Sequence, residues 1–473
     1  MLFNSLDYIL FLMLAVAGYW TLVRLNILRV VFIFFASCLF YMAWNPAYIV
    51  LILGSTLLDY SVGRAIYAAP SQKAKKRWLM VSLAGNLGLL GTFKYYNFFA
   101  SAVGDTLGLF GLSIQLPFLD VLLPVGISFY TFQTMSYTID LYRGNIEPTR
   151  NFFKFAFYVT FFPQLVAGPI VRAVQFLPQL DERPKLTREY VGKGFFLIGT
   201  GLIKKVAIAD YLAVNLVDRV FDNPEAFTAV EVLLGLYGYT AQIYCDFSGY
   251  TDVARGSAML LGFRIPENFN RPYQATSPAD FWRRWHMTLS TWLRDYLYFP
   301  LGGSRVGAFR AYWNLWLTMF LCGLWHGADW TFVLYGAIHA FAMVLHRYFY
   351  RRSGRSKDTV DPRAIFILKV VGTLHFSVFS RILFRGTTLE NSWDVTTQLF
   401  AGTSSVAQVS IGVWIILVGS YALHYLPKRF YDNLMQSYIR LPAVLQGLLL
   451  AGLGAGLMQV VSQDVVPYIY FQF

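Results

Sequence analysis

The chain has 473 residues, of which 56% are hydrophobic, 18% aromatic and 14% charged. Soluble domains carry about 25% charged residues, so this composition excludes an ordinary soluble enzyme and favours a protein whose solvent is the lipid bilayer. The net charge of +13 does not indicate nucleic-acid binding, because the basic residues cluster between apolar runs, as in cytoplasmic loops that face anionic lipid.

The N-terminal part of the chain is expected to consist of membrane spans. A bilayer core of about 30 Å is crossed by about 20 apolar residues in a helix. Runs of this kind occur near residues 6–23, 27–44, 47–67 and 78–99. The first run lacks a basic leading region and a cleavage site, so we expect a retained span rather than a signal peptide. The basic run KAKKR (73–77) follows the third span, and the positive-inside rule then places the N-terminus outside the cytoplasm.

Two apolar stretches in the next part of the chain carry many residues that interrupt helices. LPVGISFYTFQTMSYTIDLYRG (123–144) and FFPQLVAGPI (161–170) contain Gly, Pro, Ser or Thr at many positions, which predicts broken or re-entrant helices. Irregular backbone at membrane depth is tolerated where it is buried in protein or lines a wet cavity. We therefore expect both stretches to lie inside the protein.

The remaining spans and the tail complete an all-α polytopic membrane protein with about 11 to 14 membrane helices, some of them re-entrant or interfacial. Further spans are expected near residues 193–215, 228–263 (more than one element), 313–325, 330–347, 364–384, 410–426 and 443–460. The basic loops at 351–357 and 427–440 are assigned to the cytoplasm, which sends the C-terminal tail SQDVVPYIYFQF outward. We interpret the chain as a single integral domain, with N-terminal spans at 1–90, a motif-bearing core at 91–400 and C-terminal spans with the tail at 401–473.

The densest polar stretch runs from YCDFSGYTDVARGSAMLLG (244–262) through IPENFNRPY (265–273) to PADFWRRWHMTLSTWLRDYLYFPLGGSR (278–305). Its last part contains DFWRRWHMTLSTWLRDYLYFP, residues 280–300. Its aromatic residues recur at helical spacing between charged ones, which predicts one amphipathic helix lying at the lipid headgroups. Arg283 and Arg284 on such a helix suit an acyl donor that carries phosphate groups. His286 is interpreted either as a packed interfacial histidine or as a site residue.

Aspartates and lysines also occur in segments that are otherwise able to span the membrane. Intramembrane carboxylates are costly and normally face a partner or a cavity. For Asp246 and Asp252, a hydrogen-bond network within the helix packing is favoured over catalysis. The side chains expected to form this network are Ser248, Tyr250 and Thr251. Lys204 and Lys205 are interpreted as a cytoplasmic edge, with Asp210 available as a pairing partner.

His326, in the sequence LWHGADW, is the strongest candidate for a catalytic side chain. It follows the basic edge at Arg305–Arg310 by about 15 residues, or about 22 Å of helix, and is therefore expected deep in the membrane. A neutral imidazole tolerates that depth and still accepts a proton. Gly323 and Gly327 permit close approach of backbone or substrate, and Asp329 would orient the ring if the segment stays helical. The alternative is a histidine that hydrogen-bonds to neighbouring helices.

Other common chemistries have no support in the sequence. The chain contains no G-x-S-x-G elbow, Walker loop, H-E-x-x-H motif or CxxC pair. Cys38, Cys245 and Cys322 lie in apolar segments without metal-like spacing and are interpreted as small hydrophobic residues. We therefore expect no metal site, and histidine remains the candidate base.

Several long motifs occur in a fixed order along the chain. They are FKYYNFF (93–99), LPVGISFYTFQTMSYTIDLYRG, FFPQLVAGPI, GLIKKVAIAD, the block from YCDFSGYTD to PLGGSR, and GLWHGADW. Together they closely resemble the membrane-bound O-acyltransferase (MBOAT) family, in the bacterial branch that contains the alginate O-acetylation and teichoic-acid D-alanylation membrane proteins. The resemblance covers nearly the whole chain from about residue 90 onward and is strongest to the alginate O-acetylation members.

The resemblance implies a ring of tilted helices around a central tunnel that opens to the cytoplasm and to the exterior. An acyl group would arrive on a cytoplasmic thioester, either acetyl-CoA or the phosphopantetheine arm of an acyl-carrier protein, and no tightly bound cofactor is expected. The family's signature histidine matches His326, and the second signature position of this branch matches His286. Asp329 departs from relatives, in which that position is often small or weakly polar, so its role toward the ring is in doubt. Positions assigned to the donor path or tunnel lining are Asp246, Ser248, Tyr250, Trp325, Arg283 and Arg284.

The C-terminal sequence YIYFQF (468–473) carries no charged side chain and by itself is typical of an aromatic anchor at the membrane interface. It also resembles the C-terminal aromatic-tyrosine motif of many bacterial relatives and of the small membrane partner of the D-alanylation system. In that motif a tyrosine is a candidate transient acyl carrier, and the matching residue is Tyr470. The tail would fold back into the outer mouth of the tunnel, where His326 would activate the Tyr470 hydroxyl.

We therefore expect a transmembrane O-acyltransferase of the bacterial inner membrane that moves acetyl groups toward an exported polysaccharide such as alginate or another envelope glycan. A periplasmic SGNH-type acetyltransferase-like partner is expected to accept the acyl group, no nucleic acid is expected as a partner, and a homo-oligomer is left open. The second hypothesis is the same chemistry with D-alanine as cargo, toward a teichoic acid-type polymer. Two other classes stay open: a proton or solute transporter with an intramembrane His and Asp path, and a scaffold that recruits a periplasmic transferase.

Overall fold

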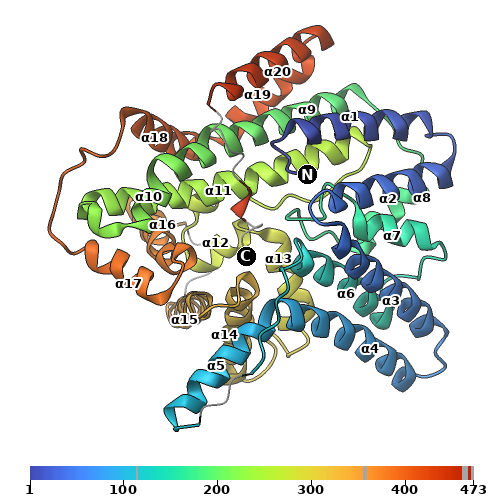
Figure 1. Ribbon diagram of the computed structural model, residues 1–473, viewed down its shortest axis with the longest axis horizontal. Coiled ribbons are helices and arrows are strands. Elements are labelled where there is room, and N and C mark those ends of the chain that lie inside the picture. The colour runs from blue at the N-terminus through green and yellow to red at the C-terminus, as the bar shows by residue number, and fades with distance from the viewer. Residues whose placement is uncertain (113–115, 355–359, 461–466, 470–473) are drawn as a thin grey trace. The chain divides into compact units, whose positions relative to one another are not determined.

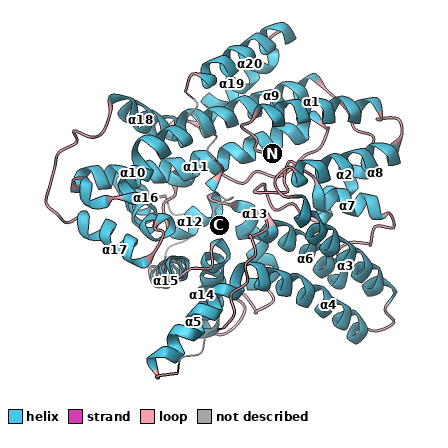
Figure 2. Ribbon diagram, in the orientation of Figure 1, coloured by secondary structure: helices cyan, strands magenta, loops and turns pink. Residues whose placement is uncertain are grey.

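The computed structural model describes residues 1–112, 116–354, 360–460 and 467–469, and every regular element in these ranges is a helix (Figure 1, Figure 2). The expected all-α fold is confirmed. The described chain divides into two compact units. The first comprises Met1–Thr187 and Ser257–Pro266, and the second comprises Arg188–Gly256 and the described residues from Glu267 onward.

The first unit contains helices α1 to α8. Their bounds are α1 Leu6–Thr21, α2 Asn26–Met42, α3 Ile49–Ala68, α4 Gln72–Leu90, α5 Tyr96–Leu109, α6 Ile127–Arg143, α7 Phe152–Thr160 and α8 Ala173–Asp181, with a 3-10 turn η1 at Pro46–Tyr48 and a π-helical turn η2 at Gly91–Tyr95. Helices α3, α4 and α6 pack against one another. At their contact the buried Asp59 carboxylate accepts hydrogen bonds from Ser82 Oγ (2.6 Å) and Asn86 Nδ2 (2.8 Å). The buried charge therefore has the partners that such a group requires.

The two stretches expected to be broken or re-entrant differ from each other. Residues 127–143 form one regular helix, α6, so the predicted interruption by small and polar residues is wrong there. The irregular part lies before the helix, where Gly126 has φ 78° and a Cβ would come 2.6 Å from the Leu165 carbonyl oxygen. Residues 161–170 are irregular and buried along their whole length, as expected for non-helical backbone inside the protein.

The second unit carries the candidate site residues. Its helices are α9 Arg188–Leu202, α10 Asp218–Asp222, α11 Ala229–Leu260 (whose last turn belongs to the first unit), α12 Pro278–Arg284, α13 Met287–Leu293, α14 Ala308–His326, α15 Trp330–Arg352, α16 Arg363–Arg385, α17 Leu389–Gln398, α18 Ile411–Tyr425, α19 Lys428–Arg440 and α20 Ala443–Met458. The shorter turns are η3 Ile203–Asp210, η4 Ala213–Val217, η5 Pro224–Ala226, η6 Pro272–Gln274 and η7 Arg294–Tyr298. Residues 229–260, expected to hold more than one element, form a single helix.

Helices α14 and α15 form the most closely packed helix pair of the second unit. Their backbones meet at glycines, because a Cβ on Gly323 would lie 2.2 Å from the Gly336 Cα atom. This contact confirms the close backbone approach expected at Gly323. The short connection from residue 327 to 329 then fixes where α14 ends relative to α15.

The stretch expected to be one amphipathic helix is divided into α12, α13 and η7, so that prediction is wrong. The break lies at His286, which adopts the left-handed conformation (φ 43°, ψ 54°). A non-glycine residue in this conformation costs about 1–3 kcal/mol, so surrounding contacts must hold it. Phe281 and Trp285, which define the helical spacing in the sequence, are both buried at 1% exposure. The periodic aromatic residues therefore serve the interior packing of the second unit.

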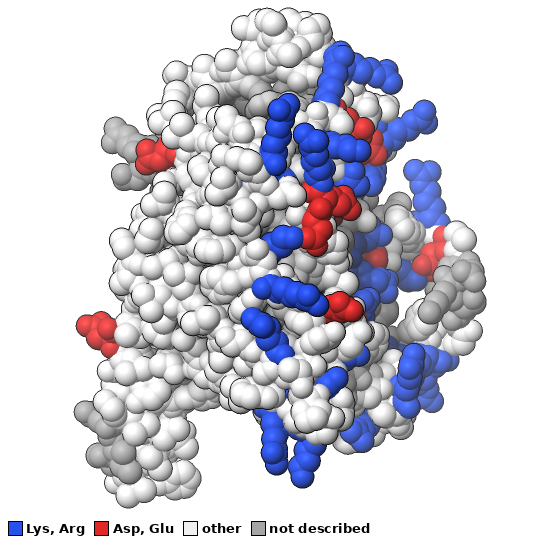
Figure 3. All heavy atoms as spheres, turned by 90° about the vertical axis from the view of Figure 1, so that its right-hand side faces the viewer, with Lys and Arg blue, Asp and Glu red and all other residues white. Residues whose placement is uncertain are grey.

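Three helical segments of the described chain are long and apolar enough to cross a membrane: Pro46–Ala68, Trp330–Arg352 and Arg363–Arg385. Shorter apolar helices occur at Leu6–Thr21, Asn26–Met42, Ile411–Tyr425 and Ala443–Met458. In the view of Figure 3 basic side chains outnumber acidic ones, and large areas of the surface carry neither. These features identify a membrane protein.

Candidate active site

His326 is the last residue of α14 and is buried, with 2% of the residue exposed. Gly327 leaves the helix at once, with extended backbone (φ −158°, ψ 152°). The centroid of the imidazole ring lies 5.2 Å from that of Trp325, 5.2 Å from that of Phe384 and 6.4 Å from that of Tyr335. The imidazole is therefore held at a helix end among aromatic rings.

Asp329, which would orient the His326 ring if the helix continued, has a different role. Because α14 ends at His326, the helical spacing of three residues that this role requires is absent. The Asp329 carboxylate instead caps α15 by accepting a hydrogen bond from the Thr331 N–H (2.8 Å). Asp at this position satisfies one of the unpaired N–H groups at the start of a helix.

His286 occupies the break between α12 and α13 and is fully buried. Its ring packs edge-on against Phe247, with centroids 4.8 Å apart, and against Trp325, with centroids 5.7 Å apart. Its Nδ1 atom lies 3.2 Å from Oδ1 of Asn268. Burial and ring contacts are compatible with both interpretations left open for this residue, and its role as a site residue stays a prediction.

Trp325 brings the two histidines together. The indole ring contacts both His286, from the break between α12 and α13, and His326, its neighbour in the chain. We call His286, Trp325 and His326 the histidine cluster. Burial favours the neutral form of an imidazole, which is the form that takes up a proton. The cluster therefore has the chemical capacity for general acid–base catalysis.

Arg381 of α16 is a further residue of this region that sequence reasoning missed. It is 1% exposed, and its Cζ atom lies 4.7 Å from the ring centroid of Trp285 and 5.3 Å from that of Phe384. Its Nη1 atom donates to the Tyr335 hydroxyl at 3.3 Å. Phe384 and Tyr335 also contact His326, so the arginine supports the wall of the cluster. The available signal was a charge inside an apolar run, since intramembrane charges mark functional positions.

His339 of α15 and Ser380 of α16 resemble a base and a nucleophile, but their hydrogen bonds exclude that role. Nδ1 of His339 lies 3.3 Å from Nε1 of Trp282, and an indole N–H can only donate. The proton of the neutral ring is therefore on Nε2, which lies 3.2 Å from Ser380 Oγ. Ser380 Oγ donates in turn to the Ser377 carbonyl oxygen (2.9 Å). A protonated Nε2 cannot take the serine proton, so this pair is structural.

The lysines of η3 form ion pairs with α11. Lys205 is fully buried, and its Nζ atom lies 2.7 Å from Oδ1 of Asp210 and 2.8 Å from Oδ1 of Asp246. Lys204 Nζ lies 2.6 Å from Oδ2 of Asp252. The pairing with Asp210 is confirmed for Lys205, and the assignment of the two lysines to a cytoplasmic edge stays a prediction. Asp246 and Asp252 of α11 each pair with a lysine, so lysines and not the expected hydroxyl groups are the charge partners of these two carboxylates.

The same ion pair holds the described part of the C-terminal tail. Lys205 Nζ donates to the Pro467 carbonyl oxygen (3.1 Å), and Asp246 Oδ2 accepts the Ile469 N–H (3.0 Å). Lys205 Nζ also lies 4.4 Å from the centroid of the Tyr468 ring, a cation–π contact. We call Lys205 and Asp246, with these contacts to residues 467–469, the tail clamp. The tail therefore folds back against η3 and α11 as far as it is described.

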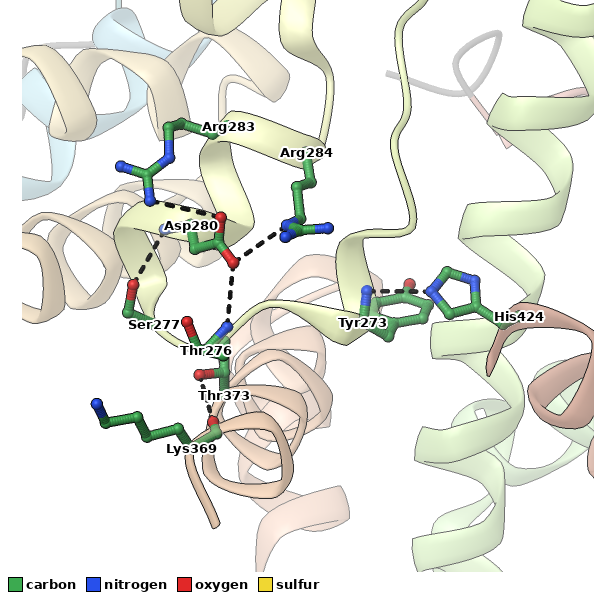
Figure 4. A network of polar contacts seen from close by, with 9 residues as sticks. All are labelled: Tyr273, Thr276, Ser277, Asp280, Arg283, Arg284, Lys369, Thr373 and His424. Atoms are coloured by element: carbon green, nitrogen blue, oxygen red, sulfur yellow. Dashed lines mark hydrogen bonds and ion pairs between the residues drawn. The ribbon is translucent and has the colours of Figure 1, made fainter. Parts of the chain in front are cut away.

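Arg283 and Arg284, at the end of α12, share one carboxylate of the same helix (Figure 4). Asp280 Oδ2 lies 3.1 Å from Arg284 Nε, and Oδ1 lies 3.4 Å from Arg283 Nη2. The Thr276 N–H also donates to Asp280 Oδ2 (3.2 Å). The Arg283 side chain is 71% exposed and the Arg284 side chain 31%. Their proposed role toward a phosphate-bearing donor stays a prediction.

The other predicted site residues lie on α11 or outside the described ranges. Ser248 and Tyr250 are buried, and the Tyr250 ring packs edge-on against Tyr468 at 5.0 Å, beside the tail clamp. Tyr470 lies outside the described residues. Among those that are described, no group of three or more His, Cys, Asp or Glu side chains is placed to hold a metal ion.

Comparison with known proteins assigns the chain to a family. The profile of the MBOAT, membrane-bound O-acyltransferase family, matches residues 147–386. The protein of Pseudomonas aeruginosa named probable alginate O-acetylase AlgI is 40% identical over 410 residues, which are 85% of this chain and 76% of that protein. The peptidoglycan O-acetyltransferase of Helicobacter pylori is 36% identical over 388 residues, which are 76% of this chain and 71% of that protein. The teichoic acid D-alanyltransferase of Bacillus subtilis is 30% identical over 287 residues, which are 55% of this chain and 68% of that protein. The chain therefore belongs to the membrane-bound O-acyltransferase family and is an O-acyltransferase embedded in the membrane.

Proposed function

We propose that the protein transfers an acetyl group from a cytoplasmic thioester to a hydroxyl on the outer side of the inner membrane, for O-acetylation of an exported polysaccharide. The observation that carries this proposal is the histidine cluster, in which Trp325 joins two buried imidazoles. Relatives named for alginate and for peptidoglycan acetylation support an acetyl cargo and a glycan acceptor.

His326 is assigned the role of general base. The hydroxyl proton passes to the imidazole while the hydroxyl oxygen forms a bond to the thioester carbonyl carbon. The C–S bond then breaks, and the departing thiolate takes up the proton. A positioned base contributes about 10²–10⁴-fold to such a step. The surrounding aromatic rings favour this reaction because they limit the access of water, which would hydrolyse the thioester.

The acyl donor is proposed to be acetyl-CoA or an acyl-carrier protein thioester, both of which carry phosphate. The Arg283 side chain is 71% exposed, and a guanidinium group binds phosphate well. Incubating the purified protein with each labelled donor in turn identifies the donor. Transfer from neither thioester would contradict this part of the proposal.

Tyr470 is proposed as a transient acyl carrier. The tail clamp supports this proposal, because it holds residues 467–469 against the second unit, one residue before Tyr470. An SGNH-type transferase on the outer side is proposed to take the acyl group from the tyrosine ester. Mass spectrometry of the C-terminal peptide after exposure to donor is expected to find the acyl mass on Tyr470. Unchanged polymer acetylation by Tyr470→Phe would contradict the carrier role.

The experiment that tests the central function compares His326→Ala with His346→Ala in purified protein given a labelled thioester. His346 lies on α15, outside the histidine cluster, and serves as a matched histidine control. We expect transfer of label to be lost in the first variant and kept in the second. Equal transfer by both variants would exclude His326 as the base.

A transporter with no covalent chemistry is the competing function. It predicts proton or solute flux in liposomes without any transfer of label, and a scaffold predicts acylation that His326→Ala leaves unchanged. D-alanine remains the second cargo, supported by the teichoic acid D-alanyltransferase relative. Supplying labelled acetyl and D-alanyl thioesters in competition decides between the two cargoes.

The proposed orientation places the N-terminus and the tail on the outer side of the bacterial inner membrane. The basic segment 427–440, which contains helix α19, supports this orientation under the positive-inside rule. Fusing a reporter that folds only in the cytoplasm after residue 473 is expected to give no signal. A signal from that fusion would reverse the assignment.

A further inference from the structure

Asn268 contacts the residues at the break between α12 and α13, where His286 lies. The residue lies in the irregular segment between α11 and α12 and is 1% exposed. Its backbone carbonyl oxygen accepts a hydrogen bond from the Met287 N–H (2.9 Å). Its side-chain oxygen, Oδ1, lies 3.2 Å from His286 Nδ1 and accepts from the Thr288 hydroxyl at 2.9 Å. One side chain thus contacts the residue at the break and the first turn of α13.

The orientation of the Asn268 amide follows from a backbone group. The Thr288 N–H lies 3.2 Å from the same atom of Asn268, and a backbone N–H can only donate. The atom that faces Thr288 and His286 is therefore the amide oxygen and not the amide nitrogen. Because this oxygen can only accept, His286 Nδ1 must carry a proton and donate it.

The tautomer of His286 follows directly. A neutral imidazole carries one proton, so a proton on Nδ1 leaves the lone pair on Nε2. Complete burial of His286 favours the neutral ring. Nε2 is therefore the ring atom of His286 that is able to accept a proton or a hydrogen bond.

We propose that Asn268 is a positioning residue that fixes the ring and the tautomer of His286. This inference rests on the proposed acyl transfer and takes His286, as the second imidazole of the histidine cluster, to act in it through Nε2. Without the Asn268 oxygen, the proton moves between the two ring nitrogens and the ring loses the contact that sets its angle. The left-handed backbone of His286 also loses a side-chain contact that holds it in place.

The test uses two substitutions with opposite expectations. Asn268→Leu keeps the volume of the side chain and removes the acceptor, whereas Asn268→Asp keeps an acceptor for all three donors. Loss of groups that orient a reacting side chain costs about 10–100-fold, and a wrong histidine tautomer costs about 10⁴-fold. We expect Asn268→Leu to lower kcat by about 100-fold or more with KM changed less than about threefold. Asn268→Asp is expected to keep at least about a tenth of kcat.

The matched control is Asn314→Leu. Asn314 is also a buried asparagine of the second unit, and its Nδ2 donates to the Leu301 carbonyl oxygen (2.9 Å). This variant removes a buried hydrogen bond of the same kind away from the break at His286. We expect it to lower thermal stability as Asn268→Leu does while keeping kcat. A kcat that falls equally in both leucine variants would reduce Asn268 to a structural residue and overturn the inference.

The outcomes separate the inference from the function on which it rests. If His286→Gln keeps full transfer, the assigned role of His286 fails. If His286→Gln is inactive while Asn268→Leu is fully active, only the positioning role fails. Equal loss in folded Asn268→Leu and Asn268→Asp also overturns that role, because retention of the acceptor then has no effect. If Asn268→Leu does not fold, Asn268→Ala carries the same expectation.

Discussion

Replacing Lys205 by methionine tests whether the tail clamp holds the C-terminus. The Nζ atom of Lys205 lies within 2.8 Å of two carboxylates and 3.1 Å from the Pro467 carbonyl oxygen, and the residue is fully buried. Methionine has a similar length and keeps the packing of the stem. The substitution therefore removes one charge and leaves two carboxylates without it, the buried one of Asp246 and that of Asp210, whose side chain is 14% exposed.

The magnitude follows from this geometry. Removing one partner of a buried ion pair costs about 3–5 kcal/mol, because the remaining charge is left in a medium that solvates it poorly. Two carboxylates depend on Lys205, which places the expected loss at the upper end of that range. Replacing Asp246 by asparagine in addition removes one of the stranded charges. We expect this double variant to be more stable than Lys205→Met alone.

The assay measures stability and tail release together. Thermal unfolding of the detergent-solubilised protein, followed by tryptophan fluorescence, reports stability, and digestion by a carboxypeptidase reports how accessible the C-terminus is. Lys204→Met is the control, since Lys204 pairs with a single carboxylate, Asp252, and its side chain is 24% exposed. We expect Lys205→Met to melt earlier and to be digested faster than this control. Identical melting and digestion of the two variants would refute the tail clamp.

Three further predictions concern the histidine cluster and the helices that support it. Arg381→Met should lower kcat by about 10–100-fold, because the guanidinium that holds the aromatic wall is lost, and an unchanged kcat would contradict that support. Gly323→Val should destabilise the protein by several kcal/mol, on the order of the largest single-residue effects, because the Cβ of the new valine would clash with Gly336 at the α14–α15 contact. Unfolding curves of the variant and the wild type measure this loss. Asp329→Ala should cost about 0.5–2 kcal/mol through the lost helix cap and keep kcat, whereas a loss as large as that of His326→Ala would restore its role as a ring partner.

The sequence alone could predict that His326, inside an apolar segment, is a candidate functional residue. An imidazole inside a long apolar run is costly, and this cost alone marks the position as a candidate for function. The close approach at Gly323 was also predictable, since glycine permits backbones to meet. The break between α14 and α15 was predictable too, because separate spans were expected near residues 313–325 and 330–347 and the helices end at His326 and begin at Trp330.

The break in the helix at His286 could not be predicted from the residues around it. Phe281 and Trp285 lie at helical spacing, a local pattern that predicts one amphipathic helix. A positive φ at a non-glycine residue depends on tertiary contacts, here those made by Asn268. The sequence alone therefore could not predict the role of Asn268, although this residue lies in the stretch that was recognised as polar.

The need of the intramembrane carboxylates for partners could be predicted from the sequence, but the partners themselves could not. Asp246 was expected to need a partner, and hydroxyl groups one turn away were the nearest candidates in the sequence. Its actual partners are Lys205 and the Ile469 N–H, which only the three-dimensional fold brings to it. Arg381 belongs to the same class, because its contacts with Trp285 and Tyr335 come from segments far from it in the sequence.

The most direct test of histidine-catalysed acyl transfer is a single-turnover measurement. Purified protein in excess over a labelled acetyl thioester is quenched at successive times, and the rate constant of label transfer is compared for the wild type and His326→Ala. Loss of a general base predicts a fall of about 10²–10⁴-fold in this constant, with the two proteins equally folded. Equal rate constants would show that the acyl group moves without His326 and would contradict the account.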